Sequence, residues 1–374
     1  MPVRRARQRG AAGPGLLIDA GPTYDMAMNL CVYHDSRCLA HENGPGHPER
    51  PERMTAILDR VTTRDYGVPL RVASAVPAAR DDLALVHTSA YLDELERSTR
   101  RPYTVFDADT AANEHSYLAA RVAAGGVIAA VRAALSGEHE YSFVAMRPPG
   151  HHAEADCAMG FCLVNHAAVA AARAIASGVE RVAIVDWDVH HGNGTHHIFA
   201  DRSDVLYASL HQSPHYPGTG RSTEIGTGPG AGYTVNVPLP AGCGEAEYLR
   251  ALDELVLPVL DQFRPELVIV SVGFDVHERD PLAGMLLTSS SFSLITRRLR
   301  DLADAHAGGR IVHVLEGGYD LRALADGVDA VLTTLANGAA EQPRPGTGGT
   351  AERLAATAIG RTREALASYW KLDP

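Results

Sequence analysis

The chain has 374 residues, 45% hydrophobic and 21% charged, a balance typical of a folded globular protein and unlike that of a disordered one. Its formal net charge is −11 and no basic stripe follows the first ten residues, which argues against direct nucleic-acid binding and suits cationic ligands. Five cysteines without CxxC spacing indicate reduced thiols in a cytoplasmic protein. The sequence contains no uninterrupted apolar run of 18 residues, so we expect no membrane span.

Residues 1–28 mix Arg, Gly, Pro and Ala without a hydrophobic period, and we expect a flexible leader there. Strands and helices then alternate. The predicted strands cover residues 31–33, 142–146, 182–185, 205–210, 267–272 and 311–315. The predicted helices cover residues 53–61, 166–177, 245–263, 290–306 and 320–335, with a kink at Pro258.

This alternation predicts an α/β fold in which a central, mostly parallel sheet is covered by helices on both faces. We expect one domain over residues 29–337. The segment 338–350 is rich in Gly, Pro and Thr and predicts a linker, followed by a C-terminal amphipathic helix within residues 351–374 that packs on or beside the domain.

A polar segment, residues 186–195, follows the β-branched run 182–185. Residues two apart in an extended strand end point the same way, so Asp186, Asp188 and His190 would converge on one side. Buried carboxylates without a basic neighbour need a counter-charge, which a divalent cation supplies. A structural cluster that caps the next helix remains the alternative interpretation.

Three other predicted strands also end in polar groups. Residues 147–152 present the pair His151 and His152 on a rigid turn, suited to proton transfer, although such a pair can also be structural. Asp275 follows a second strand, as a ligand or as a helix cap. Tyr319 follows a third strand, after two glycines that let the backbone approach a site.

The motifs together resemble the histone deacetylase and acetylpolyamine amidohydrolase family, which has the arginase/deacetylase fold. The resemblance extends from about residue 30 to 335. It is carried by HPERPER at 47–53, RPPGHH at 147–152, MGFCLVN at 159–165, DWDVHHGNGT at 186–195, SLH at 209–211, PGTG at 217–220, GFD at 273–275 with DP at 280–281, and EGGYDL at 316–321.

This resemblance implies that Asp188, His190 and Asp275 bind a catalytic zinc ion, in a ligand set that also suits Fe²⁺ or Co²⁺. It further implies a potassium ion. The potassium site would use main-chain oxygens of Asp186, Asp188, His190 and Leu210 together with the Ser209 hydroxyl.

The catalytic roles are implied in the same way. His152 would be the general base toward water and then the acid toward the leaving amine, with His151 as its electrostatic neighbour. Asp186 would hold His151, and Asn193 would hold His152. Tyr319 would donate its hydroxyl to the oxyanion.

Gly160, Phe161 and Tyr216 would line a narrow apolar tunnel that suits the stem of an acyl-lysine. Leu282 stands where polyamine-selective relatives have Glu, which favours acyl-lysine or another acylated amine over an acetylpolyamine. An amide at Asn193 and a carboxylate at Glu316 are similar to class II members of the family.

The sequence therefore predicts a zinc-dependent deacetylase that acts on an acylated lysine peptide or a small acylated amine. An acetylpolyamine amidohydrolase is the alternative. A non-catalytic acyl binder and an arginase-like binuclear manganese site fit less well, because the full set of catalytic residue types is present and no second acidic cluster occurs. Association into a homo-oligomer stays open.

Overall fold

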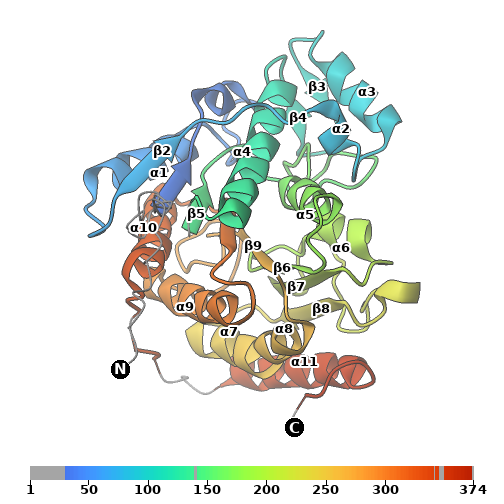
Figure 1. Cartoon of the computed structure of the whole chain (residues 1–374), viewed down its shortest axis with the longest axis vertical. Coiled ribbons are helices and arrows are strands. Elements are labelled where there is room, and N and C mark those ends of the chain that lie inside the picture. The colour runs from blue at the N-terminus through green and yellow to red at the C-terminus, as the bar shows by residue number, and fades with distance from the viewer. Residues whose placement is uncertain (1–29, 139–140, 341, 345–348, 373–374) are drawn as a thin grey trace, which may run out of the picture.

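A computed structural model describes residues 30–138, 141–340, 342–344 and 349–372 and has a single eight-stranded sheet at its centre (Figure 1). The predicted leader, residues 1–28, lies outside the described residues, as do residues 341 and 345–348 of the predicted linker. The predicted α/β fold is confirmed, since every pair of neighbouring strands in this sheet is parallel.

The six predicted strands are the six inner strands of this sheet. The pattern missed both edge strands. The first is partly exposed along its whole length, and the second is mostly buried but contains Pro238, which an edge tolerates. In spatial order the strands are β2 (Leu70–Ala73), β1 (Leu30–Tyr33), β5 (Tyr141–Val144), β10 (Ile311–Leu315), β9 (Leu267–Val272), β6 (Val182–Asp186), β7 (Val205–Gln212) and β8 (Thr234–Leu239).

Helices cover both faces of the sheet, and apolar side chains of the inner strands are shared between two hydrophobic clusters on opposite faces. In β6, Val182 and Ile184 join the cluster under α4 and α5, whereas Ala183 and Val185 join the cluster under α1, α9 and α10. The helices are α1 (Glu52–Thr63), α2 (Arg80–Leu83), α3 (Ser89–Ser98), α4 (Ser116–Ser136), α5 (His166–Ala176), α6 (Asn193–Phe199), α7 (Glu245–Ala251), α8 (Leu257–Phe263), α9 (Ser289–His306), α10 (Leu321–Asn337) and α11 (Thr350–Leu366).

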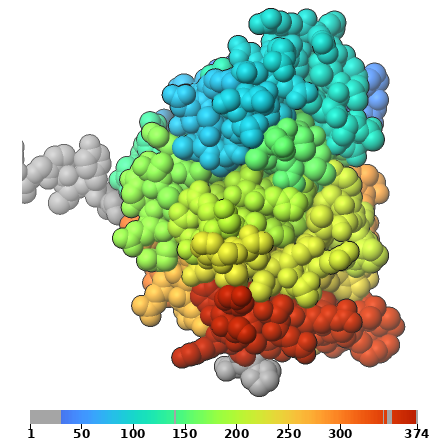
Figure 2. Space-filling model, turned by 90° about the vertical axis from the view of Figure 1, so that its right-hand side faces the viewer, coloured from blue at the N-terminus to red at the C-terminus, as the bar shows by residue number. Residues whose placement is uncertain are grey.

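The structure also contains shorter elements. They are the 3₁₀ turns η1 (Ser36–Ala40) and η2 (Gly228–Gly230) and the antiparallel pair β3 (Thr104–Val105) and β4 (Ala111–Ala112). The C-terminal helix α11 lies across one end of the molecule (Figure 2) and contacts β8 and α7.

The sequence pattern also missed α4, the longest helix among the described residues. Arg121 and Arg132 interrupt its apolar run, yet its length and mean hydropathy would allow a membrane span. It is nevertheless a core helix, because 67% of its most apolar window is buried. A Cβ at Gly125 would collide with the carbonyl of Val76, so glycine permits close packing there.

Residues 245–263 form no simple kinked helix. The structure has α7, a π-helical segment η3 (Leu252–Val256) and α8, with Pro258 at the second position of α8. Proline lacks an N–H and its ring conflicts with the carbonyl four residues earlier. The wider π turn before Pro258 accommodates the proline ring, and the helical run continues through it.

A fully buried ion cluster joins the start of α1 to the loops that follow β5 and β10. The Glu49 carboxylate accepts hydrogen bonds from Arg53 Nη1 at 3.1 Å and from Arg147 Nε and Nη2, the latter at 2.6 Å. Arg53 also donates to the carbonyls of Gly318 at 2.8 Å and Glu316 at 2.5 Å. The cluster therefore ties three distant chain segments together.

Replacing Glu49 should destabilise the protein strongly. The change Glu49→Ala leaves two guanidinium groups buried without their carboxylate, and we expect the free energy of unfolding to fall by about 3–5 kcal/mol. Urea denaturation followed by circular dichroism measures this. Glu52→Ala is the control, because the Glu52 side chain is 60% exposed and its loss should cost about 0–1 kcal/mol. Equal effects of the two changes would contradict the role of the cluster.

Candidate active site and metal centre

The predicted site residues follow four strands that are neighbours in the sheet. In the order β5, β10, β9 and β6, these strands run in parallel, so their carboxyl ends meet at one edge. The loops after them begin at residues 145, 316, 273 and 187. Ligands of open α/β sheets bind at this edge, and the strand order explains why residues far apart in the chain converge.

Asp188, His190 and Asp275 form a buried cluster at this edge. One ligand atom from each lies within 4.8 Å of the others. His190 Nδ1 is 3.0 Å from Asp188 Oδ1 and 3.3 Å from Asp275 Oδ2. The remaining carboxylate oxygens accept main-chain N–H groups, from Gly317 to Asp188 Oδ2 at 2.8 Å and from Val189 to Asp275 Oδ1 at 3.0 Å, which fixes their orientation.

These three residues fit a divalent cation. Asp275 Oδ2 is fully buried and has no hydrogen-bond partner. Burial and the negative charge of Asp188 raise the pKa of Asp275 to about 7. A bound cation would offset this cost of ionising Asp275. A Cβ at Gly317 would enter the space between the Asp188 and Asp275 oxygens, so glycine keeps that space open. Two carboxylates and an imidazole are suitable ligands for zinc.

The two histidines after β5 are held by different partners. His151 Nδ1 lies 3.0 Å from Asp186 Oδ2, which also accepts the Tyr207 hydroxyl at 2.9 Å. His152 Nδ1 lies 2.7 Å from Asn193 Oδ1. The two rings are neighbours, with centroids 4.0 Å apart. The structure thus brings together the predicted pairs of histidine and partner.

The electrostatic surroundings separate the two imidazoles. Burial alone would lower the pKa of His151, but Asp188 and Asp186 outweigh burial and raise it to about 10. The pKa of His152 is held well below its ordinary value, by burial and then by His151 and His190. His152 is therefore the neutral imidazole of the pair, as a base must be before it takes a proton.

Tyr319 stands on a loop that side chains hold from two sides. Its main-chain N–H donates to Asp280 Oδ2 at 2.6 Å, and the guanidinium of Arg53 lies 5.0 Å from its ring centre. Gly318 adopts a φ of 117°, which suits glycine, and a Cβ there would collide with Phe274. Burial raises the pKa of Tyr319 well above its ordinary value, so its hydroxyl stays protonated and can donate.

A cavity of about 210 Å³ lies above the acidic cluster. Phe161 and Tyr216 stand in its walls, and Phe161 packs edge-on against Tyr319, with ring centres 5.9 Å apart. Leu282 also lines it. The full lining is Asp109, Pro149, His151, His152, Gly160, Phe161, His190, Tyr216, Leu282, Gly317 and Tyr319.

The residues expected to hold potassium lie on β6 and β7 and the loop after β6. Asp186 and Ser209 are register partners in these adjacent strands. The Ser209 hydroxyl lies 2.9 Å from His211 Nδ1. Ser209 and Leu210 do not line the cavity described above.

Sequence reasoning missed several residues that support the site. Glu316 is one of them, since its sequence position indicates only a likeness to class II members. Its carboxylate accepts hydrogen bonds from the N–H groups of Gly150 at 2.7 Å and His151 at 3.1 Å and from the Ser271 hydroxyl at 2.9 Å. It therefore anchors the histidine loop to β9. The HPERPER motif signalled Glu49 and Arg53, but nothing in the local pattern showed that their charges are buried.

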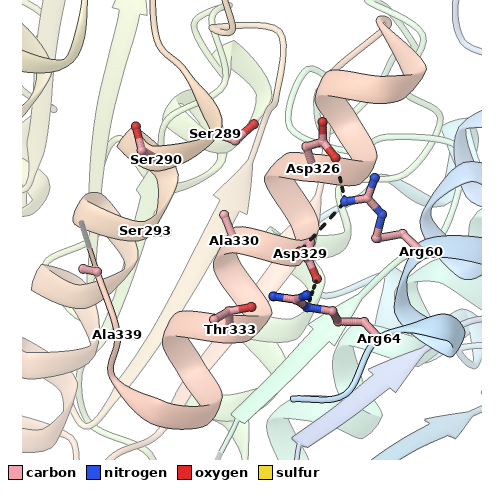
Figure 3. Close-up of a pocket in the computed structure, with 11 residues that line it drawn as sticks. Arg60, Arg64, Ser289, Ser290, Ser293, Asp326, Asp329, Ala330, Thr333 and Ala339 are labelled. Atoms are coloured by element: carbon pink, nitrogen blue, oxygen red, sulfur yellow. Dashed lines mark ion pairs between the residues drawn. The ribbon is translucent and has the colours of Figure 1, made fainter. Parts of the chain in front are cut away.

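A larger hollow, of about 470 Å³, lies between α1, α9 and α10 (Figure 3). Its charged groups already pair with one another. Arg60 Nη1 lies 2.6 Å from Asp326 Oδ1, and Arg64 Nε lies 3.5 Å from Asp329 Oδ1. It contains none of the predicted site residues, so the smaller cavity at the sheet edge is the candidate active site.

Residues 47–335 match the family model of the histone deacetylase domain. The chain is 41% identical over 292 residues to a probable deacetylase of Archaeoglobus fulgidus, covering 78% of this chain and 81% of the relative. It is 41% identical over 313 residues to a histone deacetylase-like amidohydrolase of Pseudomonas aeruginosa, covering 79% and 82%. The solved HDA15 HD domain is similar with a TM-score of 0.84 at 38% identity, covering 92% of this chain and 96% of that one.

The change Gly317→Ala should weaken metal binding, because the added methyl group would occupy the space between the carboxylates of Asp188 and Asp275. We expect the affinity for Zn²⁺ to fall on the order of 100-fold, the upper end of the cost of disturbing a metal's surroundings. Isothermal titration calorimetry measures it. Gly360→Ala is the matched control, since a Cβ there meets nothing within 4 Å. Unchanged affinity in Gly317→Ala would contradict the assigned metal position.

Proposed function

Because the chain belongs to the histone deacetylase family of deacetylases and amidohydrolases, we propose that it is a zinc-dependent amidohydrolase that removes acyl groups from N-acyl-lysine or a related acylated amine. One observation carries this proposal. A single cavity presents His152, held neutral, and Tyr319, held protonated, above the buried cluster of Asp188, His190 and Asp275.

In the proposed reaction the acyl carbonyl enters the cavity beside Tyr319. A bound divalent cation would polarise this carbonyl and lower the pKa of a water molecule. His152, whose Nδ1 is engaged by Asn193, takes the proton of the attacking water at Nε2 and later gives it to the leaving amine. The Tyr319 hydroxyl donates a hydrogen bond to the oxyanion, and the positively charged imidazolium of His151 adds a favourable charge nearby.

The cavity walls support a slender substrate with an uncharged stem. Phe161 and Tyr216 offer apolar surface for the carbon stem of a lysine. Leu282 carries no negative charge that would attract the free ammonium group of an acetylpolyamine. An acylated lysine peptide therefore fits better than an acetylpolyamine, which remains the alternative substrate.

The proposed cofactors follow from the ligand types. Zinc suits one imidazole and two carboxylates, and Fe²⁺ or Co²⁺ would also suit them. Potassium is proposed at main-chain oxygens of the segments around Asp186 and Leu210, together with the Ser209 hydroxyl. The adjacent register of Asp186 and Ser209 supports this second site.

Asn193 beside His152 and Glu316 beneath the histidine loop support a class II-like member of the family. All five cysteines are free, and four of them are buried. Free thiols support a reducing compartment, so we place the protein in the cytoplasm.

The direct test compares hydrolysis of an acetyl-lysine peptide with hydrolysis of N-acetylputrescine by the purified, zinc-loaded protein, with and without a chelator. The proposal expects faster hydrolysis of the peptide and loss of activity with the chelator. Faster hydrolysis of N-acetylputrescine would favour the alternative. Activity that resists complete metal removal would overturn the metal-dependent mechanism.

The change Tyr319→Phe should lower kcat for the peptide by about 10²- to 10³-fold with little change in KM, because it removes one oxyanion donor. Steady-state kinetics measures this, and the zinc content should stay equal to that of the unmodified protein. Tyr66→Phe is the matched control, since the Tyr66 hydroxyl bonds to Asp329, away from the cavity. A kcat reduced less than tenfold by Tyr319→Phe would speak against the assigned role.

The change Leu282→Glu should move selectivity toward the acetylpolyamine. A carboxylate at the cavity would attract the free ammonium group of N-acetylputrescine, and an exposed ion pair contributes up to about 1 kcal/mol, or about fivefold in kcat/KM. The ratio of kcat/KM for N-acetylputrescine and the peptide measures the shift. Leu282→Gln, which has similar size without charge, should leave the ratio unchanged, and an equal shift in both variants would exclude a charge effect.

A further inference from the structure

We infer that Glu154 is a positioning residue that fixes the orientation of the Asn193 carboxamide, and through it the proton on His152. Glu154 and Asn193 then form a matched pair, so that the amide at position 193 depends on the carboxylate at position 154. This inference rests on the proposed function for its catalytic consequence, while the pairing itself can be tested without activity.

The contacts of the Asn193 carboxamide settle which end faces His152. Asn193 Nδ2 lies 2.5 Å from Glu154 Oε1 and 3.2 Å from the carbonyl oxygen of His152, and both of these atoms only accept. Met159 Sδ, a weak acceptor, is 3.2 Å away on the same side. The NH₂ group must therefore point toward these atoms, which turns Oδ1 toward His152 Nδ1 at 2.7 Å.

This orientation decides the form of the catalytic imidazole. Because Asn193 Oδ1 can only accept, His152 must carry its hydrogen on Nδ1. Nε2 is then the unprotonated nitrogen, as a base in the cavity requires. With the amide turned the other way, Nδ1 would face a donor and the hydrogen would move to Nε2, which blocks the base.

Glu154 is itself firmly placed. Its side chain is 16% exposed, and Oε1 also accepts from His197 Nδ1 at 2.8 Å. Its main-chain oxygen accepts from His87 Nδ1 at 2.9 Å, and its N–H donates to the carbonyl of Cys157 at 3.0 Å. The carboxylate therefore has little freedom to leave Asn193.

The same geometry explains why position 193 carries an amide. The change Asn193→Asp would set a second carboxylate oxygen against Glu154 Oε1, at the place where Nδ2 now lies 2.5 Å away. Like charges at this distance disfavour ionisation of both groups. The carboxylate of Glu154 thus contacts Asn193 and not His152, and a carboxylate at position 193 fits better beside the neutral amide of the Glu154→Gln variant.

A double-mutant cycle on the zinc-loaded full chain tests the pair, with kcat and KM for the acetyl-lysine peptide as readouts. Glu154→Ala should lower kcat on the order of tenfold with KM nearly unchanged, and Glu154→Gln, which keeps an accepting oxygen, should restore most of it. The factor by which Asn193→Asp reduces kcat should be about tenfold smaller in the Glu154→Gln background than in the unmodified protein. Additive effects in this cycle would overturn the inference. Asp156→Asn is the control, because Asp156 lies in the same loop and its side chain is exposed.

A spectroscopic readout separates this inference from the proposed function. In ¹H–¹⁵N correlation spectra, with the His152→Asn variant used for assignment, the His152 ring should carry its hydrogen on Nδ1 in the unmodified protein. Glu154→Ala should mix the two ring forms, and Asp156→Asn should not. A chain that hydrolyses neither substrate but shows this change refutes the function and keeps the pairing, whereas an unchanged ring form in Glu154→Ala refutes the pairing.

Discussion

The buried carboxylate of Glu49, held between two guanidinium groups, is the constraint on which the rest of the site depends. Removing three charges from water is costly unless each charge is paired and hydrogen-bonded. Glu49 meets that requirement with Arg53 and Arg147, and the spare guanidinium donors bind main-chain carbonyls, including Glu316 and Gly318. The loops after β5 and β10 are thereby tied to the start of α1, and these are the loops that carry the histidine pair and Tyr319.

Within the site, side chains of the same type have different pKa values because their surroundings differ. His151 and His152 are adjacent in sequence, yet carboxylates raise the pKa of one and burial with neighbouring imidazoles lowers that of the other. Asp188 and Asp275 likewise share one buried space, where burial and mutual repulsion raise the pKa of Asp275. A cation between the carboxylates and a neutral base at the wall together satisfy this arrangement, which supports hydrolysis of an amide more than simple binding of an acyl group.

Much of this arrangement could be predicted from the sequence, because β-branched runs mark the inner strands and polar residues follow each of them directly. The predictions failed where local pattern and tertiary packing differ. Helix α4 is apolar on most sides and lacks an amphipathic period, and η3 depends on how Pro258 is accommodated. Glu49 and Arg147 are 98 positions apart, so their pairing leaves no local signal. The contact of Glu154 with Asn193 was missed because a charged residue in a loop ordinarily faces solvent.

An anomalous difference map, recorded at the zinc absorption edge from crystals of the zinc-loaded protein, would locate the metal directly. We expect one strong peak in the buried space, next to the carboxylate oxygens of Asp188 and Asp275 and to His190 Nδ1. A peak at another place, or none at this cluster in fully loaded protein, would contradict the assignment of the metal centre and with it the proposed mechanism.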